Sequence, residues 1–235
     1  MHLFYTPDIT PANKDWFLTE EESKHCTRVL RLEKGDQVNL IDGKGGLYAA
    51  TISDAHPKRT ILHIEAVITE YGKRNHYLHI AVAPTKNLDR LEWFLEKATE
   101  IGIDEVSLII TQRSERKEAK IDRLNKIITA AMKQSLKAYH PVLNEAISFN
   151  KFINQPFDGQ KFVAHCANSE KVAIKDQFKP NSNYLVMIGP EGDFTEKEVG
   201  DALQNGFKAI TLGESRLRTE TAALEACFEI NFLNR

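Results

Sequence analysis

The chain contains 235 residues, of which 42% are hydrophobic and 27% are charged, and its formal net charge at pH 7 is −2. This composition is typical of a folded globular protein, and no run approaches the roughly 18 apolar residues that would span a membrane. The cysteines at positions 26, 166 and 227 are odd in number and widely spaced, which argues against a disulfide framework. Because no secretory signal is visible near Met1 either, we expect a cytoplasmic protein.

The charge pattern does not by itself identify a partner. A net negative chain is not typical of nucleic-acid-binding proteins, whose surfaces are usually basic. Residues 112–137 nevertheless hold eight Lys or Arg side chains against three acidic ones. On charge alone, a solvated helix face explains this segment better than a binding surface does.

Residues 1 to about 70 have the pattern of short strands. Residues 37–41 and 47–52 flank the glycine-rich segment 42–46, which predicts a hairpin turn, and residues 61–68 alternate as a half-buried strand does. A helix is expected over residues 20–32. Several short strands in a small segment predict a compact β-barrel.

Strand and helix patterns alternate in the rest of the chain. The predicted strands cover 76–84, 105–110, 161–165, 184–188 and 208–212, and predicted helices begin at Asn87, Ile121 and Thr221. Gly102 and Pro141 stop the first two of these helices. Strands that alternate with helices predict a parallel α/β sheet covered on both faces.

The strand at 184–188 runs into the turn Gly189-Pro190-Glu191-Gly192, and Thr195 with Glu198 forms a capping box for the next helix. Two glycines around a proline would let the backbone approach a ligand closely at the carboxyl end of a strand, where α/β proteins bind ligands. A tight connection without a ligand is an equal alternative from this motif alone.

A second strand end, at Leu212, precedes the segment GESRLRTETA at 213–222. Arg216 and Arg218 lie among polar residues there and could meet a phosphate or a base edge. The alternative is a solvated loop in which Thr219 or Thr221 caps the last helix.

GPEGDF at 189–194 and LGESRLRTETA at 212–222 resemble the signature segments of the 16S rRNA uridine N3-methyltransferase family of the SPOUT superfamily. Shorter matches follow the same order along nearly the whole chain: HCTRVLR at 25–31, KATEIG at 97–102, TQRS at 111–114 and QS at 134–135. The resemblance implies a PUA-like RNA-binding β-barrel over 1–70 and an α/β methyltransferase domain with a C-terminal trefoil knot over 73–235. It also implies a homodimer, with active sites at the subunit interface, that acts on 16S rRNA of the small ribosomal subunit.

The resemblance implies S-adenosyl-L-methionine as cofactor, and the loop after His165 and Cys166 as a further contributor to its site. The expected cofactor-binding residues lie in the two signature segments: Ile188, Gly189, Glu191, Gly192, Leu212, Gly213, Leu217 and Arg218. For catalysis, Arg218 is expected to stabilise the anion formed when uracil N3 loses its proton, and Glu220 or Glu191 to accept that proton. Each glutamate has an ordinary alternative as a loop or helix-start carboxylate.

RNA binding requires cations and polar side chains that face phosphates. Lys24, Arg28 and Arg31 recur at i, i+4 and i+7, so on the predicted helix 20–32 they would form one stripe; a plain surface stripe balanced by Glu20, Glu21 and Glu22 is the alternative. The further candidates are Lys86, Arg90, Arg113, Ser114, Gln134 and Arg216.

Three positions depart from the family pattern. Asp193 stands where a glycine is usual, Ser215 where a basic residue is common, and Lys137 where arginine is frequent. Asp193 places a carboxylate near the expected cofactor loop, or favours the start of the following helix. Arg216 could replace the RNA contact that Ser215 lacks.

No metal site is expected, because the eight histidines form no convincing ligand set, and neither GxxxxGK[ST] nor GxGxxG occurs. Two other functions stay open: a non-catalytic RNA-binding or ribosome-assembly factor that keeps the fold, and a SPOUT methyltransferase acting on another RNA or on a ribose hydroxyl. The cofactor motifs favour an enzyme, and the N-terminal barrel with RTET at 218–221 favours ribosomal RNA. The sequence does not fix the target nucleotide.

Overall fold

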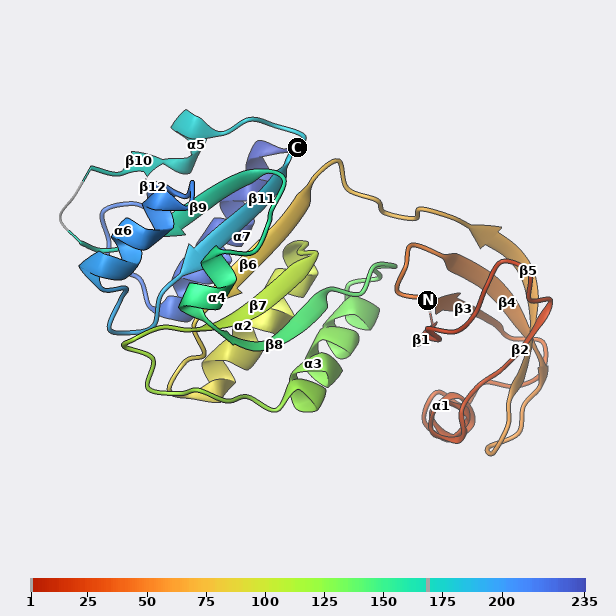
Figure 1. Ribbon diagram of the computed structural model, residues 1–235. Coiled ribbons are helices and arrows are strands. Elements are labelled where there is room, and N and C mark those ends of the chain that lie inside the picture. Colours follow the sequence, from red (N-terminus) through yellow and green to blue (C-terminus); the bar gives the residue numbers. More distant parts are fainter. Residues whose placement is uncertain (1, 168–169) are drawn as a thin grey trace. The chain divides into compact units, whose positions relative to one another are not determined.

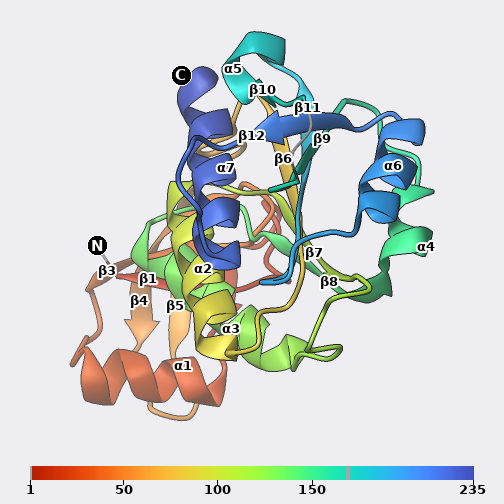
Figure 2. The same cartoon turned by 90° about the vertical axis from the view of Figure 1, so that its left-hand side faces the viewer.

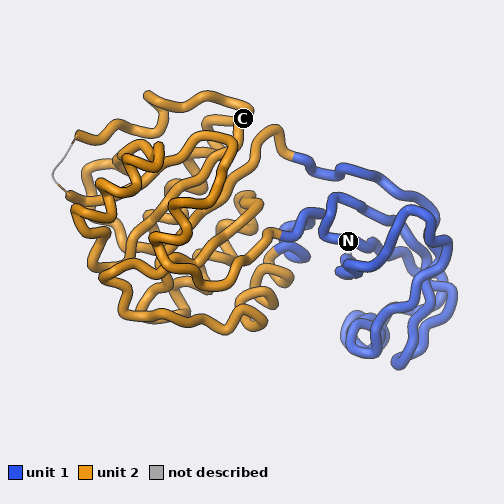
Figure 3. Tube along the Cα trace, in the orientation of Figure 1, with its two compact units in different colours: residues 1–73, 132–140 blue, residues 74–131, 141–235 orange. Residues whose placement is uncertain are grey.

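The computed structural model describes residues 2–167 and 170–235, which form two compact units (Figure 3). The small unit contains residues up to Lys73 together with 132–140, and the large unit contains 74–131 and 141–235. The segment 132–140 belongs to the small unit through backbone hydrogen bonds from Gly45 N to Ala138 O and from His140 N to Gly43 O, both 2.9 Å long.

The described part of the small unit contains a five-stranded sheet in the order β1-β3-β4-β5-β2 (Figure 1). Its strands are β1 (Leu3–Tyr5), β2 (Asp15–Phe17), β3 (Gln37–Ile41), β4 (Leu47–Asp54) and β5 (Ile61–Ile68). Neighbours are antiparallel except for β1 with β3. Because alternate residues of these strands are buried, the unit has a hydrophobic core of its own, which includes Phe4, Leu40, Tyr48 and Leu62.

The predicted hairpin turn joins β3 to β4. Asp42 Oδ1 accepts hydrogen bonds from the backbone N–H groups of Lys44 (2.7 Å) and Gly46 (2.8 Å). Gly45 has a φ of 102°, a conformation that side chains other than hydrogen disfavour. The turn prediction is confirmed.

The helix predicted over residues 20–32 is confirmed at its start, but it changes type after Lys24 and ends earlier than predicted. The α-helix α1 (Glu20–Lys24) passes into a π-helix, η1 (His25–Val29). Leu30 N donates to His25 O at 2.9 Å, and Arg31 then takes a left-handed φ of 57°, so the helix has ended. The wider π-turn and the early end remove the periodicity on which the predicted stripe of Lys24, Arg28 and Arg31 depended.

The large unit is built on a parallel sheet, which within the described residues has the order β10-β12-β9-β11-β6-β7-β8 (Figure 1). Its strands are β6 (Tyr77–Val82), β7 (Glu105–Ile110), β8 (Val142–Ser148), β9 (Gln160–Ala164), β10 (Val172–Ala173), β11 (Asn183–Ile188) and β12 (Lys208–Thr211). The prediction of a parallel α/β sheet is confirmed, and the strand predicted at 105–110 has the predicted bounds.

Helices cover both faces of this sheet. Figure 2 shows α2 (Leu88–Ile101) and α7 (Thr219–Leu233) on one side, and α4 (Phe149–Ile153) and α6 (Glu196–Gln204) on the other. The buried strand β11 contributes to both cores: Tyr184, Val186 and Ile188 pack with α2 and α7, whereas Leu185 and Met187 pack with α4 and α6. This alternation explains why β11 is a continuous apolar run.

The helix ends follow local sequence signals. Asn87 Oδ1 accepts from Asp89 N at 3.1 Å at the start of α2, and Gly102 ends that helix with a φ of 130°. The predicted capping box of α6 is confirmed, because the Thr195 hydroxyl and the Glu198 carboxylate each bond the other's backbone N–H. The remaining helices are α3 (Ile121–Gln134) and the short α5 (Ile174–Gln177).

Candidate active site

A cavity of about 650 Å³ lies at the carboxyl edge of the large unit's sheet. Three loops line it, those that follow β9, β11 and β12. Because β9 pairs in parallel with both β11 and β12, its loop lies between the two signature loops. All eight expected cofactor residues line this cavity: Ile188, Gly189, Glu191, Gly192, Leu212, Gly213, Leu217 and Arg218.

Gly189 and Gly192 of the first signature loop pack closely against other protein atoms, whereas the sequence suggested a close approach to a ligand or a tight connection. A Cβ at Gly189 would lie 3.1 Å from the Phe194 ring, and one at Gly192 would lie 3.3 Å from the Arg113 Cβ. Arg113 also donates from Nη1 to Gly192 O at 2.8 Å. Close packing inside the loop therefore accounts for both glycines, in addition to any approach of a ligand.

Asp193 ties the first signature loop to the loop after β9. Its φ is 61°, a left-handed conformation that glycine adopts freely and that aspartate tolerates better than most residues. Its Oδ2 accepts from Cys166 N and its Oδ1 from Phe194 N, both at 2.8 Å. A glycine at this position would keep the turn but lose the connection.

Thr219 connects the two signature loops. The terminal helix begins at Thr219, two residues earlier than predicted, and its N-cap is the backbone of Arg218 without a side-chain cap. The alternative that Thr219 or Thr221 caps this helix is therefore wrong. Instead, the Thr219 hydroxyl donates to Gly189 O at 3.1 Å across the loops.

The structure separates the three expected catalytic residues. Arg218 and Glu191 line the cavity and are exposed, and Glu191 Oε1 accepts from Lys86 N at 3.0 Å. Glu220 is only 7% exposed and does not line the cavity; it lies behind Arg90, which does, with Oε1 3.8 Å from Arg90 Nε. Glu220 Oε2 has no hydrogen-bond partner among the described residues, which for a buried carboxylate costs about 1–3 kcal/mol or more.

The RNA-binding candidates of the large unit fall into two groups. Arg90 and Arg216 line the cavity. Lys86 does not line it; this residue is exposed, and its Nζ pairs with Glu115 Oε2 at 2.9 Å. Ser114, in contrast, is buried, and its Oγ accepts from Thr111 N at 3.0 Å, so its hydroxyl stabilises a turn. Together with the Arg113 bond to Gly192, this assigns Arg113 and Ser114 structural contacts that the sequence did not predict.

The remaining candidates belong to the small unit. Lys24 pairs with Glu20 at 2.7 Å, and Arg28 is the basic residue in the last turn of η1. Arg31 lies beyond that helix, so the single stripe is wrong as predicted. Gln134 is exposed and groups with the small unit, not with the large one as expected.

His165 and Lys171, from the loop after β9, also line the cavity. His165 is 7% exposed, and neither ring nitrogen has a hydrogen-bond partner among the described residues. Burial, followed by the nearby Lys171 ammonium, lowers the pKa of His165 below its ordinary 6.5, so the ring is neutral at pH 7. Lys171 Nζ donates to the backbone oxygens of His165 (3.1 Å) and Ala167 (2.9 Å), which braces the loop. The resemblance implies this loop as a contributor to the site, but the Lys171 contacts had no signal in the sequence, since the position of β9 between β11 and β12 is set by long-range pairing.

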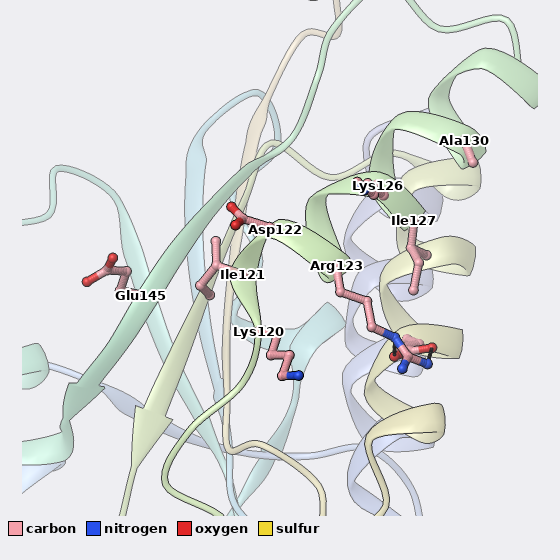
Figure 4. A pocket seen from close by; sticks show the side chains of 9 residues that line it. Lys120, Ile121, Asp122, Arg123, Lys126, Ile127, Ala130 and Glu145 are labelled. Atoms are coloured by element: carbon pink, nitrogen blue, oxygen red, sulfur yellow. Dashed lines mark hydrogen bonds and ion pairs between the residues drawn. The ribbon is translucent and has the colours of Figure 1, made fainter. Parts of the chain in front are cut away.

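A second depression, of about 860 Å³, lies at the start of α3 (Figure 4). Its charged lining residues oppose one another, Lys120, Arg123 and Lys126 against Glu92, Asp122 and Glu145. Arg123 Nε pairs with Glu92 Oε1 at 2.7 Å. Because these charges largely cancel and no signature segment reaches this depression, we place the active site at the first cavity.

No helix in the described part of the chain is both long and apolar enough to cross a membrane.

Comparisons with known proteins point to one family. Residues 73–231 match the family model described as an RNA methyltransferase domain, and residues 18–65 match that of an RNA methyltransferase PUA domain. A Borreliella burgdorferi protein named ribosomal RNA small subunit methyltransferase E 2 is 30% identical over 85% of this chain and 84% of its own length. The Rickettsia conorii ribosomal RNA small subunit methyltransferase E is 28% identical over 98% and 95%.

Solved structures cover the whole chain. The crystal structure of a Porphyromonas gingivalis protein described as a probable rRNA-methyltransferase is 40% identical, covers 100% of this chain and 98% of its own, and has a TM-score of 0.92. Ribosomal RNA small subunit methyltransferase E of Neisseria gonorrhoeae, solved with S-adenosylmethionine bound, is 26% identical with the same coverage and a TM-score of 0.89. The chain belongs to the ribosomal RNA small subunit methyltransferase E family of RNA methyltransferases.

Proposed function

We propose that this protein transfers the methyl group of S-adenosyl-L-methionine to N3 of a specific uridine in 16S rRNA of the small ribosomal subunit. The observation that carries the proposal is the convergence of both signature loops on one cavity at the carboxyl edge of a parallel sheet. In α/β proteins this edge is where ligands bind. The relatives named for rRNA methylation support the substrate class.

The cavity fits the cofactor in size and in chemistry. Its volume, about 650 Å³, lies within the range of small-molecule sites. The residues that would hold the cofactor are those of the signature loops, from Ile188 to Gly192 and from Leu212 to Arg218. The buried imidazole of His165 lacks a partner, as expected of a polar group that a ligand completes. When bound, S-adenosylmethionine supplies a methyl group activated by its sulfonium.

The chain's own residues would prepare the acceptor. Uracil N3 lies on the Watson–Crick edge, so the base must be unpaired or flipped out to reach the cavity. The Arg218 guanidinium, at the cavity wall, would stabilise the negative charge that the uracil ring gains as N3 loses its proton. Of the two glutamates, Glu191 is the one at the cavity wall, so we favour it as proton acceptor.

The buried position of Glu220 suits a different task. Its carboxylate lies 3.8 Å from Arg90 Nε, and Arg90 reaches the cavity. We propose that Glu220 orients Arg90 toward the substrate, which is a positioning role. Arg90, Arg216 and Lys86, together with Arg28 and Arg31 of the small unit, would bind RNA phosphates.

The proposal includes a homodimer in the cytoplasm and a C-terminal trefoil knot, as the family resemblance implies. Exposed aromatic side chains support the dimer: Trp93 on α2 is 43% exposed, and Phe228 and Phe232 on α7 are 43% and 57% exposed. The last two stack with ring centroids 5.9 Å apart. These two helices lie side by side on one face of the large unit (Figure 2), where a second copy would bury them.

Nucleoside analysis of ribosomal RNA tests the proposal. RNA from cells that lack this protein should lose 3-methyluridine from 16S rRNA, and purified protein with S-adenosylmethionine should restore it. If the protein binds the RNA but transfers no methyl group, it is a non-catalytic assembly factor. If another nucleoside or another RNA gains the methyl group, the reaction class stands and the assigned substrate is wrong.

A further inference from the structure

The loop after β7, residues 111–116, is bonded to the first signature loop and to the helix start that follows it. Gln112 N donates to Oε1 of the buried Glu198 at 2.8 Å, and Arg113 Nη1 donates to Gly192 O at the same distance. Glu198 belongs to the capping box of α6, so its carboxylate is itself held in place. The start of this loop therefore has a fixed position relative to the first signature loop.

Arg116, at the end of the same loop, bonds to the loop after β6. Its Nε and Nη2 both donate to Lys86 O, at 3.2 and 3.0 Å. A guanidinium is a rigid planar fork, so two of its N–H groups on one carbonyl restrict the backbone of Lys86 more than a single bond would. Arg116 is half-buried and is not among the residues that line the cavity. Its contact is thus with the backbone at residue 86.

Lys86 in turn holds Glu191, the residue at the cavity wall that we favour as proton acceptor. Lys86 N donates to Glu191 Oε1 at 3.0 Å, which within the described residues is the one hydrogen bond of that carboxylate. The pKa of the Lys86 ammonium is raised, chiefly by its hydrogen bond to Glu115 and to a smaller extent by the charge of Glu191. Backbone and side chain of Lys86 therefore both lie near Glu191.

We infer that Arg116 is a positioning residue for proton removal, because through Lys86 it holds the Glu191 carboxylate in place at the cavity. The inference rests on the proposed function, in which Glu191 accepts the proton of uracil N3. In that step the N3–H bond breaks, its electron pair stays on the uracil ring, and the proton goes to a carboxylate oxygen of Glu191. A carboxylate held at one oxygen has fewer orientations to lose when the base arrives.

Single-turnover methylation at saturating RNA and S-adenosylmethionine tests the role of Arg116. Arg116→Ala should lower the rate by about tenfold, since a small misplacement of a reacting group is costly. The affinities for RNA and for S-adenosylmethionine should stay near those of the wild type. Arg116→Lys, which can offer one hydrogen bond to Lys86 O, should recover part of the loss. Thermal unfolding checks that each variant is folded.

A double-mutant cycle with Glu191 shows whether Arg116 acts through that carboxylate. Glu191→Gln keeps an oxygen for Lys86 N but takes up no proton at neutral pH, so it should lower the rate by about 100-fold. In the Glu191→Gln background, Arg116→Ala should cause little further loss, because the group that it positions no longer reacts. A residue that supports the fold elsewhere would lower the rate by the same factor in both backgrounds.

Salt dependence of RNA binding separates positioning from a phosphate contact. Arg116→Ala should leave the slope of log affinity against log salt unchanged, whereas loss of a phosphate contact would lower it by roughly one. Lys117→Ala is the matched control, because Lys117 is the exposed cation next in the same loop. It removes the same charge and should leave the methylation rate at saturating RNA unchanged.

The outcomes distinguish this inference from the proposed function. An unchanged rate in Arg116→Ala, an equal loss with and without Glu191→Gln, or a lowered salt slope overturns the inference while methyl transfer stands. A fully active Glu191→Gln variant does the same, because Glu191 is then not the proton acceptor. If the wild-type protein methylates no RNA, the proposed function fails together with this inference.

Discussion

Arg218 belongs to the second signature segment, lines the cavity and has the central role in the proposed chemistry. It is the N-cap residue of α7, its side chain is exposed, and it lines the cavity between the signature loops. An arginine there can serve catalysis or can clamp a phosphate. The two roles differ in whether the contact strengthens in the transition state.

If Arg218 stabilises the developing uracil anion, Arg218→Ala should lower the single-turnover methylation rate by about 100-fold, the scale for one preorganised donor. RNA affinity should fall much less. Arg218→Lys should recover little, because a point charge does not reproduce the planar guanidinium. Raising the pH should partly rescue the alanine variant, because hydroxide then helps to remove the N3 proton.

The neighbouring Arg216 supplies the control, since it is exposed and lines the same cavity. Arg216→Ala should weaken RNA binding while the rate at saturating RNA stays near that of the wild type. Equal losses of RNA binding and rate in Arg218→Ala would make that residue a phosphate clamp.

His79 in β6 is a buried titratable residue far from the proposed chemistry in sequence. Its ring contacts Ser107 Oγ at 2.9 Å and packs edge-on against Phe152. Burial lowers its pKa from 6.5 to about 4, against the opposing effect of Glu105 at 3.7 Å. Between these values the unfolded chain binds the proton and the folded chain does not, so stability falls as the pH falls through this window.

We therefore predict that the free energy of unfolding of the large unit falls as the pH drops from 6.5 to 4, with a contribution from His79 of roughly 3 kcal/mol. His79→Phe should remove that contribution. Urea titrations in a Trp16→Phe background, in which Trp93 reports the large unit, measure it. His63→Gln, at an exposed histidine of the small unit, is the control, and an unchanged slope in His79→Phe would contradict the assignment.

At the scale of elements, η1 changes the expectation for RNA binding. A regular helix would have placed Arg28 and Arg31 on one face, but Arg28 lies within the π-helix and Arg31 lies after it with a φ of 57°. We expect the two residues to contribute unequally. A residue that contacts a phosphate should lower the slope of log affinity against log salt by roughly one when it is replaced.

Arg28→Ala and Arg31→Ala, measured separately by RNA binding at several salt concentrations, should thus differ in slope, with cofactor binding unchanged in both. Lys24→Ala is the matched control, because the pairing of Lys24 with Glu20 already satisfies its charge. Slopes that are unchanged in both arginine variants would assign them to plain surface.

The elements that the sequence predicted well are those with local signals. The strand at 105–110 is a run of apolar residues, and the start of α6 is specified by Thr195 and Glu198 alone. The strand β8 was not predicted, because its half-exposed sequence VLNEAIS lacks such a run. The π-turn in η1 and the left-handed Arg31 have no comparable signal in the sequence.

The site also contains parts that the sequence predicts and parts that it does not. Its two signature loops are contiguous segments, so their residues could be named before the fold was known. The bracing by Lys171, the burial of Glu220 and the Asp193 bond to Cys166 depend on which strands are neighbours. That order joins segments far apart in the chain, and periodicity carries no information about it.

At the scale of the whole molecule, the proposed homodimer can be tested at the exposed aromatic side chains of α7. Phe228 and Phe232 are exposed on α7, although exposed aromatic pairs are costly in water. We predict that Phe228→Glu combined with Phe232→Glu converts a dimer into a monomer at micromolar concentration, measured by light scattering. If the active site is completed across the interface, as the family resemblance implies, methylation should be lost with the dimer.

A matched control separates this effect from a general loss of apolar surface. Leu203 on α6 is 45% exposed, and α6 covers the opposite face of the sheet from α7 (Figure 2). Leu203→Glu should leave both the mass and the activity unchanged. A folded double variant that stays dimeric would place the interface elsewhere, and a fully active monomer would show that one chain holds a complete site. Either result would leave the methyl transfer proposed at the cavity unchanged, but the proposed contribution of the partner chain through this face would be withdrawn.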